Sequence, residues 1–193
     1  MTNHIPIEVS ARHIHLSKID SEILFGKKYI FSINENLSQS NQYSTIETVK
    51  LVSKKDCIDN VRLIMPIRSE TQVEVSLTDA RKLGIMPPVR ESGHLLGSVG
   101  GVKIIGPKGK IELKYGVIVS KRHLHIEPDK AKDLELSNGQ IISIKVKGER
   151  STTYHDVVVR SKSGIDNLSF MIDTDEANAS GISSDSYGEI VYE

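Results

Sequence analysis

Short segments in which apolar and polar residues alternate recur along the whole chain. Successive side chains of a strand point to opposite faces, so this pattern is typical of strands that bury one face. Helical signals are brief: residues 18–26, a segment capped by Ser76 or Thr78, and a stretch that starts near Pro128. The pattern predicts a mainly β protein, with strands in IPIEVS, ETVKLVSK, NVRLIMPI, TQVEVSL, VKIIGPKGKIELKYGVIVS, QIISIKVKG, TTYHDVVVR, LSFMIDT and EIVYE.

Two stretches lack this alternation. Residues 34–44, NENLSQSNQYS, are polar, and residues 87–101, PPVRESGHLLGSVGG, are rich in Gly and Pro. Such compositions mark turns and loops, because Gly and Pro interrupt regular elements. We therefore expect two loops, of which the first is exposed to solvent.

One nine-residue segment occurs twice. VSARHIHLS at residues 9–17 matches VSKRHLHIE at residues 119–127, with the Val, the Ser, the Arg and both His identical. The match indicates a duplication, and the short strands favour small barrels over a parallel sheet with crossover helices. The sequence therefore predicts two small duplicated β-barrel domains with short capping helices, at residues 1–112 and 113–193.

Each repeat carries two histidines separated by one residue. Residues i and i+2 of a strand point to the same face, so His13 and His15 can direct two imidazoles to one point. His123 and His125 can do the same. Imidazole binds zinc, copper, iron and nickel, and the absence of nearby cysteine favours a catalytic centre over a structural one. The alternative is that each pair is solvated or hydrogen-bonded within the protein.

Several neighbouring residues allow two interpretations each. Arg12 and Arg122, which precede the two histidine pairs, either bind an anion or form ion pairs. Arg90 lies in the Gly-rich loop and can hold phosphate with its bidentate guanidinium, or pair with Glu91 at the surface. His94 in the same loop is a candidate metal ligand or general base.

Composition excludes several classes of protein. The 193 residues include 25 Lys and Arg and 25 Asp and Glu, and this zero net charge argues against an extended nucleic-acid surface. The chain has no apolar run near the ~20 residues that cross a bilayer, and no signal-peptide pattern at its start. The single cysteine, Cys57, excludes an internal disulfide and fits a cytoplasmic location.

Six motifs that run along nearly the whole chain are highly specific as a set. They are VSARHIHLS, LSQSNQYSTIETVKLV, TQVEVSLTDARKLGI, PPVRESG, IIGPKGKIELKYGVIVSKRHLHI and IDTDEANASGI. Together they resemble the PduL-type phosphate propanoyltransferases, which are phosphotransacylases associated with bacterial microcompartments. The resemblance implies two β-barrel domains with a metal site between them, at which acyl-CoA and phosphate give acyl phosphate and CoA.

The resemblance also implies roles for particular residues. His13 and His15 would hold one zinc ion, His123 and His125 a second, and Arg90 the phosphate. The family further implies a homodimer, a short-chain substrate such as propanoyl-CoA or acetyl-CoA, and a cytoplasmic or microcompartment location. The residues expected against CoA are Val9, Ser10, Ala11 and Asn178.

Three positions depart from the family pattern. Leu96 stands where the family has a Glu that completes the first metal site, and Met171 where it has a His that completes the second. Leu77 replaces an Arg near CoA. Leucine cannot bind a metal, and thioether sulfur suits zinc poorly, although His94 can take the place of the first missing ligand. A non-catalytic or weakly active relative that binds CoA or metal is therefore the alternative, and a hydrolase that uses water as the nucleophile is a third.

Overall fold

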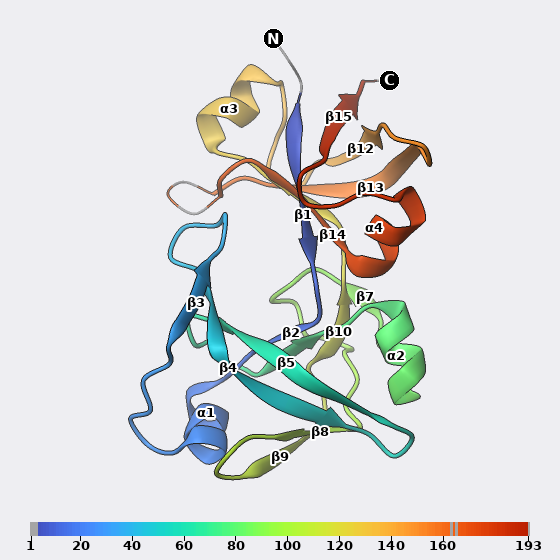
Figure 1. The fold of residues 1–193 in the computed structure, drawn as a ribbon. Helices are drawn as coiled ribbons and strands as arrows, with labels where there is room; N and C mark the ends of the chain where they lie inside the picture. The colour runs from blue at the N-terminus through green and yellow to red at the C-terminus, as the bar shows by residue number, and fades with distance from the viewer. Residues whose placement is uncertain (1–3, 163, 165, 193) are drawn as a thin grey trace. The chain divides into compact units, whose positions relative to one another are not determined.

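The computed structural model describes residues 4–162, 164 and 166–192. It confirms a mainly β protein with short helices (Figure 1). The helices are α1 (Lys18–Phe25), α2 (Leu77–Leu83), α3 (Pro128–Asp133) and α4 (Thr174–Ser180). The strands are β1 (Ile5–Ser10), β2 (His13–His15), β3 (Ile33–Asn36), β4 (Tyr43–Val52), β5 (Cys57–Met65), β6 (Gln72–Glu74), β7 (Val89–Arg90), β8 (Val102–Ile105), β9 (Lys110–Leu113), β10 (Val117–Ser120), β11 (His123–His125), β12 (Ile141–Val146), β13 (Thr152–Arg160), β14 (Ser169–Asp173) and β15 (Tyr187–Val191).

The chain forms two compact units. Unit 1 comprises Met1–Ala11, Ser38–Ser40 and Lys121–Glu193, and unit 2 comprises Arg12–Leu37 and Asn41–Ser120. This division differs from a boundary after residue 112. The difference arises because β1 pairs with β14 and β15, whereas β10 pairs with β6 and β7.

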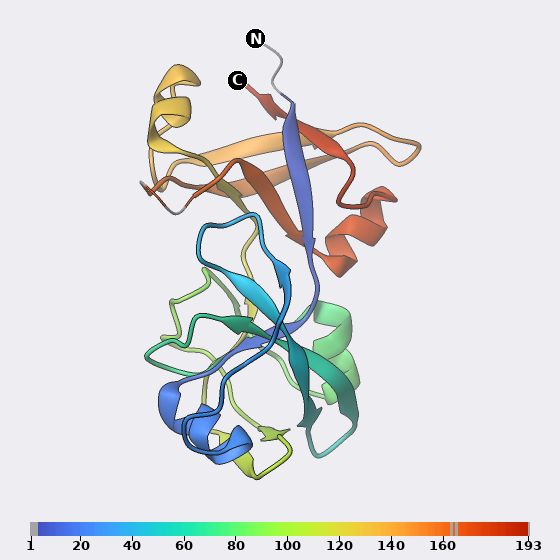
Figure 2. The ribbon, with the colours of Figure 1, turned by 60° about the vertical axis from the view of Figure 1, so that its left-hand side comes forward.

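Unit 1 is a closed barrel in the strand order β1, β14, β11, β13, β12, β15 (Figures 1 and 2). Closure leaves no unpaired sheet edge among these strands. Alternate residues of each strand point inward and form one apolar core. Its largest fully buried side chains are Ile5, Leu124, Ile126 and Phe170.

Unit 2 is a half-barrel sheet. Its strands follow the order β7, β10, β6, β2, β5, β4, β8, β9, and β3 pairs with β4. Helix α1 begins after Ser17, whose side chain accepts a hydrogen bond from the Asp20 backbone, and it lies close to β9. Together the barrel, the half-barrel and the short helices confirm the expected fold class. None of the helices described here has the length and apolar character that crossing a membrane requires.

The duplication is visible in the strand pairing of both units. In unit 2, β2 lies between parallel β5 and antiparallel β6. In unit 1, β11 lies between parallel β13 and antiparallel β14. The strand that precedes each histidine motif belongs to the unit that does not hold the motif. Strand β1, before the motif of unit 2, pairs in parallel with β14 of unit 1, and β10, before the motif of unit 1, pairs in parallel with β6 of unit 2. Each histidine pair is therefore held on a central strand, paired on both sides.

The polar stretch at residues 34–44 is only partly the exposed loop that we expected. Its first residues form β3, and Gln39 at its tip is buried in unit 1, with 5% of its surface exposed. The side-chain amide of Gln39 donates to the Asn167 carbonyl at 3.2 Å and to Ser169 Oγ at 2.9 Å, and it accepts from the Asn167 backbone at 2.9 Å. This correction has a physical reason: a buried amide is stable where all of its polar atoms find partners.

Candidate metal centres

The first histidine pair lies beside a buried carboxylate. The antiparallel register of β2 and β6 sets His13 opposite Glu74. Glu74 Oε1 lies 3.6 Å from His13 Nε2 and 3.9 Å from His15 Nε2. All three side chains are buried, and one candidate ligand atom from each lies within 4.8 Å of the others. Two histidines and one glutamate are a common ligand set of catalytic zinc sites, in which the fourth position stays open.

The charges of this group also suit a divalent cation. Burial lowers the pKa of His15 well below its usual value, and His13 and Arg68 lower it further, so the His15 ring is neutral at physiological pH. Burial alone would raise the pKa of Glu74. The charges and hydrogen bonds of His13, His15 and Ser92 outweigh it and hold that pKa well below the usual value. The group therefore offers a neutral imidazole of His15 and an ionised carboxylate, the forms that bind metal.

A hydrogen-bond network fixes the Glu74 carboxylate. Glu74 Oε1 accepts from Ser92 Oγ at 2.7 Å and from Gln72 Nε2 at 2.5 Å. Gln72 Oε1 in turn accepts from the Gly93 backbone at 2.8 Å, and Arg68 Nη1 donates to Ser92 Oγ at 3.1 Å. The Gly-rich loop is thereby attached to the carboxylate. Such outer partners orient metal ligands and tune their affinity.

This group corrects the expectation that Leu96 leaves the first pair without a carboxylate. Leu96 is 92% exposed, and the third member of the group comes from β6 instead of the loop. The structure also does not bring His94 to the pair, because its ring is exposed and lies 4.0 Å from Glu91. A signal for Glu74 was present in TQVEVSL, where an ionisable residue lies between Val73 and Val75 of a predicted strand.

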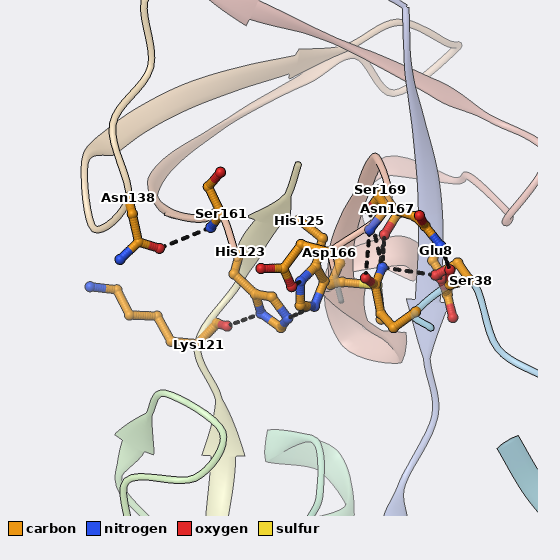
Figure 3. A network of polar contacts seen from close by, with 12 residues as sticks. Glu8, Ser38, Lys121, His123, His125, Asn138, Ser161, Asp166, Asn167 and Ser169 are labelled. Atoms are coloured by element: carbon orange, nitrogen blue, oxygen red, sulfur yellow. Dashed lines mark hydrogen bonds and ion pairs between the residues drawn. The ribbon is translucent and has the colours of Figure 1, made fainter. Parts of the chain in front are cut away.

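The second histidine pair has a different arrangement (Figure 3). His123 Nδ1 donates to the Lys121 carbonyl at 2.8 Å, and His125 Nδ1 lies 2.5 Å from Asp166 Oδ1. The two Nε2 atoms face each other at 3.1 Å. Opposite His123, where the first pair has Glu74, the register of β11 and β14 sets Met171.

The second pair is also suited to metal by its protonation. Burial, followed by the charges of Arg160 and Lys162, lowers the pKa of His125 to about 3, so its ring is neutral at physiological pH. A ring that donates from Nδ1 keeps its lone pair on Nε2. Two such lone pairs repel each other at hydrogen-bond distance, and a cation between them removes the repulsion. The ring nitrogens therefore fit a metal ion, but among the residues that the structure describes no carboxylate completes a metal-binding group with them.

The arginines that precede the histidines form ion pairs. Arg12 Nη1 lies 3.0 Å from Asp79 Oδ1, and Arg122 Nε lies 2.8 Å from Glu176 Oε1. Each carboxylate belongs to the third residue of a short helix, α2 or α4. Of the two interpretations of these arginines, the structure favours the ion pair. The symmetry of the two contacts is a further trace of the duplication.

Arg90 lies on β7 at the start of the Gly-rich loop. Its side chain is exposed and donates to the Val89 carbonyl at 2.9 Å and to the Leu96 carbonyl at 3.3 Å. The loop, rather than the Arg90 side chain itself, contacts the first group through Ser92. A second arginine, the half-buried Arg68, acts electrostatically on His15. Sequence reasoning missed it, because it lies between two strands without a motif.

The residues expected against CoA gather in unit 1. Val9 and Ser10 end β1, Ala11 follows them, and Asn178 lies on α4, which packs against β1. Val9 and Ser10 are half-buried, while Ala11 and Asn178 are exposed. The fold therefore brings these four residues to neighbouring elements, as a shared binding surface requires.

Together, the fold and the two buried histidine pairs define a duplicated β-barrel protein whose central strands can each present metal ligands. A family model described as phosphate propanoyltransferase matches residues 6–183. The phosphate propanoyltransferase of Thermotoga maritima is 43% identical over 189 residues, which cover 97% of this chain and 88% of that protein. That of Priestia megaterium is 46% identical over 187 residues, covering 97% and 85%, and that of Salmonella typhimurium is 45% identical over 178 residues, covering 92% and 83%. The chain belongs to the phosphate propanoyltransferase family and is an acyltransferase.

Proposed function

We propose that the chain transfers a short acyl group between CoA and phosphate, converting propanoyl-CoA or acetyl-CoA and phosphate to acyl phosphate and CoA. The observation that carries this proposal is the buried group of His13, His15 and Glu74, with the positive charge of Arg68 beside it. The family of the chain supports the reaction class.

The residues of the first group would hold a zinc ion, which would supply Lewis acidity and a position for an anionic oxygen. Arg68 and Arg90 are the guanidinium groups suited to bind phosphate, because each can donate two parallel hydrogen bonds. Phosphate held in this way presents an oxygen to the thioester carbonyl carbon. The new carbon–oxygen bond forms, the carbon–sulfur bond breaks, and CoA leaves as a thiolate.

The proposed reaction is a direct transfer. Arg68 and Arg90 would stabilise the oxyanion that develops on the carbonyl, and binding both substrates in a fixed orientation would lower the entropic barrier of the reaction. Among the described residues, the sole cysteine, Cys57, is half-buried near the turn between β4 and β5, and it has no place in this chemistry. The proposal therefore needs no covalent enzyme intermediate.

Further parts of the proposal concern the second pair and the assembly. His123 and His125 would hold a second zinc ion, and CoA would lie along the end of β1 and α4. The expected homodimer, the cytoplasmic or microcompartment location and the preference for short acyl chains stay predictions that follow from the family resemblance.

The proposal is tested by measuring CoA release from propanoyl-CoA with phosphate, using the purified chain with added zinc. We expect turnover that depends on phosphate, with acetyl-CoA as a parallel substrate. Replacing phosphate by sulfate is the matched control for the nucleophile. No turnover with any short acyl-CoA at high protein concentration would refute the proposal.

A non-catalytic relative is less well supported. That alternative rested on two missing ligands, and in the proposal Glu74 would provide the carboxylate of the first site in place of a residue at position 96. Met171 remains a departure from the family pattern, and it affects only the second histidine pair, because it lies opposite His123. Elemental analysis separates the two hypotheses, because a protein without bound metal and without turnover would support the non-catalytic one.

A further inference from the structure

We infer that the two metal centres of this chain are unequal, and that Asp166 is a positioning residue for the second. In this inference, which rests on the metal binding in the proposed function, His123 and His125 form a two-histidine centre. That centre binds zinc more weakly than the first group and leaves more coordination positions open.

The contacts of Asp166 suit a positioning role. Its side chain is buried, with 3% of the residue exposed, and Oδ1 lies 2.5 Å from His125 Nδ1. The carboxylate therefore meets the imidazole on the side away from Nε2 (Figure 3). A carboxylate in this position fixes the tautomer and the ring orientation, and it raises the basicity of the nitrogen that faces the metal.

The backbone fixes the other ring in the same sense. The Lys121 carbonyl can only accept, so His123 donates from Nδ1 and keeps its lone pair on Nε2. The Nε2 atoms of His123 and His125 are 3.1 Å apart. Two nitrogens bound at ~2.05 Å to one tetrahedral zinc ion are about 3.3 Å apart. The pair is thus close to the geometry of two ligands of a single ion.

The inequality of the centres follows from the strand register. The residue opposite His13 is Glu74, whereas the residue opposite His123 is Met171. A thioether is a soft ligand that binds zinc weakly, so the equivalent position contributes a carboxylate in one centre and none in the other. Asp166 supplies negative charge behind the ring instead of beside the metal.

The segment that carries Asp166 is anchored by a distant part of the chain. The backbone N–H of Asn167 donates to the Gln39 side chain at 2.9 Å, and the Asn167 carbonyl accepts from that side chain at 3.2 Å. The side-chain amide of Asn167 donates to the Ser38 carbonyl. Residues 38–40 thus hold the residue next to Asp166. Preorganised outer residues of this kind maintain ligand geometry before the metal arrives.

The test is a zinc titration of the metal-free full chain, with competition by a chelator and elemental analysis to count bound ions. We expect two zinc ions per chain, one bound tightly and one bound at least tenfold more weakly. Glu74→Gln should weaken the tight step and leave the weak one, which identifies the two steps. Asp166→Asn should weaken the weak step by ~10–100-fold and leave the tight step unchanged.

Two further variants keep the inference falsifiable. Met171→Glu copies the position of Glu74 and should strengthen the weak step at least tenfold, bringing the two affinities together. Asp185→Asn, at an exposed carboxylate of the same unit, should change neither step. Two equal steps in the unaltered chain, a single bound ion at saturation, or equal loss of both steps in Asp166→Asn would overturn the inference. Because the readout is metal binding, a chain that fails the CoA-release assay can still pass this one.

Discussion

Glu74→Gln is the sharpest test of the first metal centre. The substitution keeps the size of the side chain and removes its charge. The amide oxygen can still accept from Ser92 and Gln72, which contact the carboxylate at 2.7 and 2.5 Å. The local packing should therefore survive, and the loss is confined to the negatively charged ligand that faces His13 and His15.

The magnitude follows from binding linkage. Loss of an outer partner of a metal ligand costs ~10–100-fold in affinity, so loss of the ligand charge should cost at least about 100-fold. Zinc at 100 times its dissociation constant stabilises the folded chain by about 2.7 kcal/mol, whereas the variant at the same zinc concentration gains about 0.4 kcal/mol. The difference of about 2.3 kcal/mol corresponds to roughly 5–9 °C in Tm for a chain of this length.

Without metal the variant should also be less stable than the unaltered chain, because the contacts with His13, His15 and Ser92 outweigh the desolvation cost of the ionised carboxylate. The zinc-induced rise in Tm, measured separately for each protein, therefore isolates the loss of metal binding. Thermal unfolding with chelator and with zinc measures both quantities, and CoA release should fall by roughly 10²–10³-fold, as for loss of one electrostatic stabiliser. Glu112→Gln, at an exposed position of the same unit, is the control. An equal zinc-induced rise in Tm for the variant and the unaltered chain would refute the metal assignment.

Three other predictions concern the phosphate, the second histidine pair and the buried glutamine. Arg68→Ala and Arg90→Ala should each raise the KM for phosphate roughly tenfold or more, because charged hydrogen bonds contribute ~1.5–3 kcal/mol; unchanged KM in either variant removes that arginine from the phosphate site. The folded-state pKa of His125 is about 3, below its ordinary 6.5. The contribution of His125 to the free energy of unfolding of the metal-free chain should therefore be fully present above about pH 6.5 and decrease as the pH falls toward 3. Urea unfolding at a series of pH values should show a smaller decrease over that range for His125→Gln. Gln39→Ala removes the partner of the half-buried Asn167 backbone and of the buried Ser169 hydroxyl, and should lower the free energy of unfolding by ~1–3 kcal/mol; a loss below 0.5 kcal/mol, the scale of a surface change, would contradict the anchoring role.

Much of the site could be read before the fold was known. The two histidines of each motif share one face because strand geometry repeats every second residue, and this holds wherever the strand lies. In the structure, β2 and β11 are central strands and their histidines are buried, which the motif alone did not predict. The family resemblance was likewise carried by local motifs, and the matching family model covers them.

Other partners of the histidines are far away in the chain. Glu74 meets His13 only through the pairing of β2 with β6, and Asp166 meets His125 through a loop before β14. An alignment by motif placed the missing carboxylate at Leu96, because motif spacing carries no information on strand register. The burial of Gln39 was missed for the same reason: a polar stretch reads as an exposed loop until its partners are known.

The sequence by itself determined the strand-rich fold, the duplication and the side of each strand on which the imidazoles lie, since all three depend on local periodicity. Only the tertiary structure decided which unit each terminal strand completes and which acidic residue each histidine pair receives. Those outcomes depend on pairing between distant segments, where a shift of one residue moves every side chain to the other face. The result is one pair with a carboxylate beside its nitrogens and one with a carboxylate behind a ring.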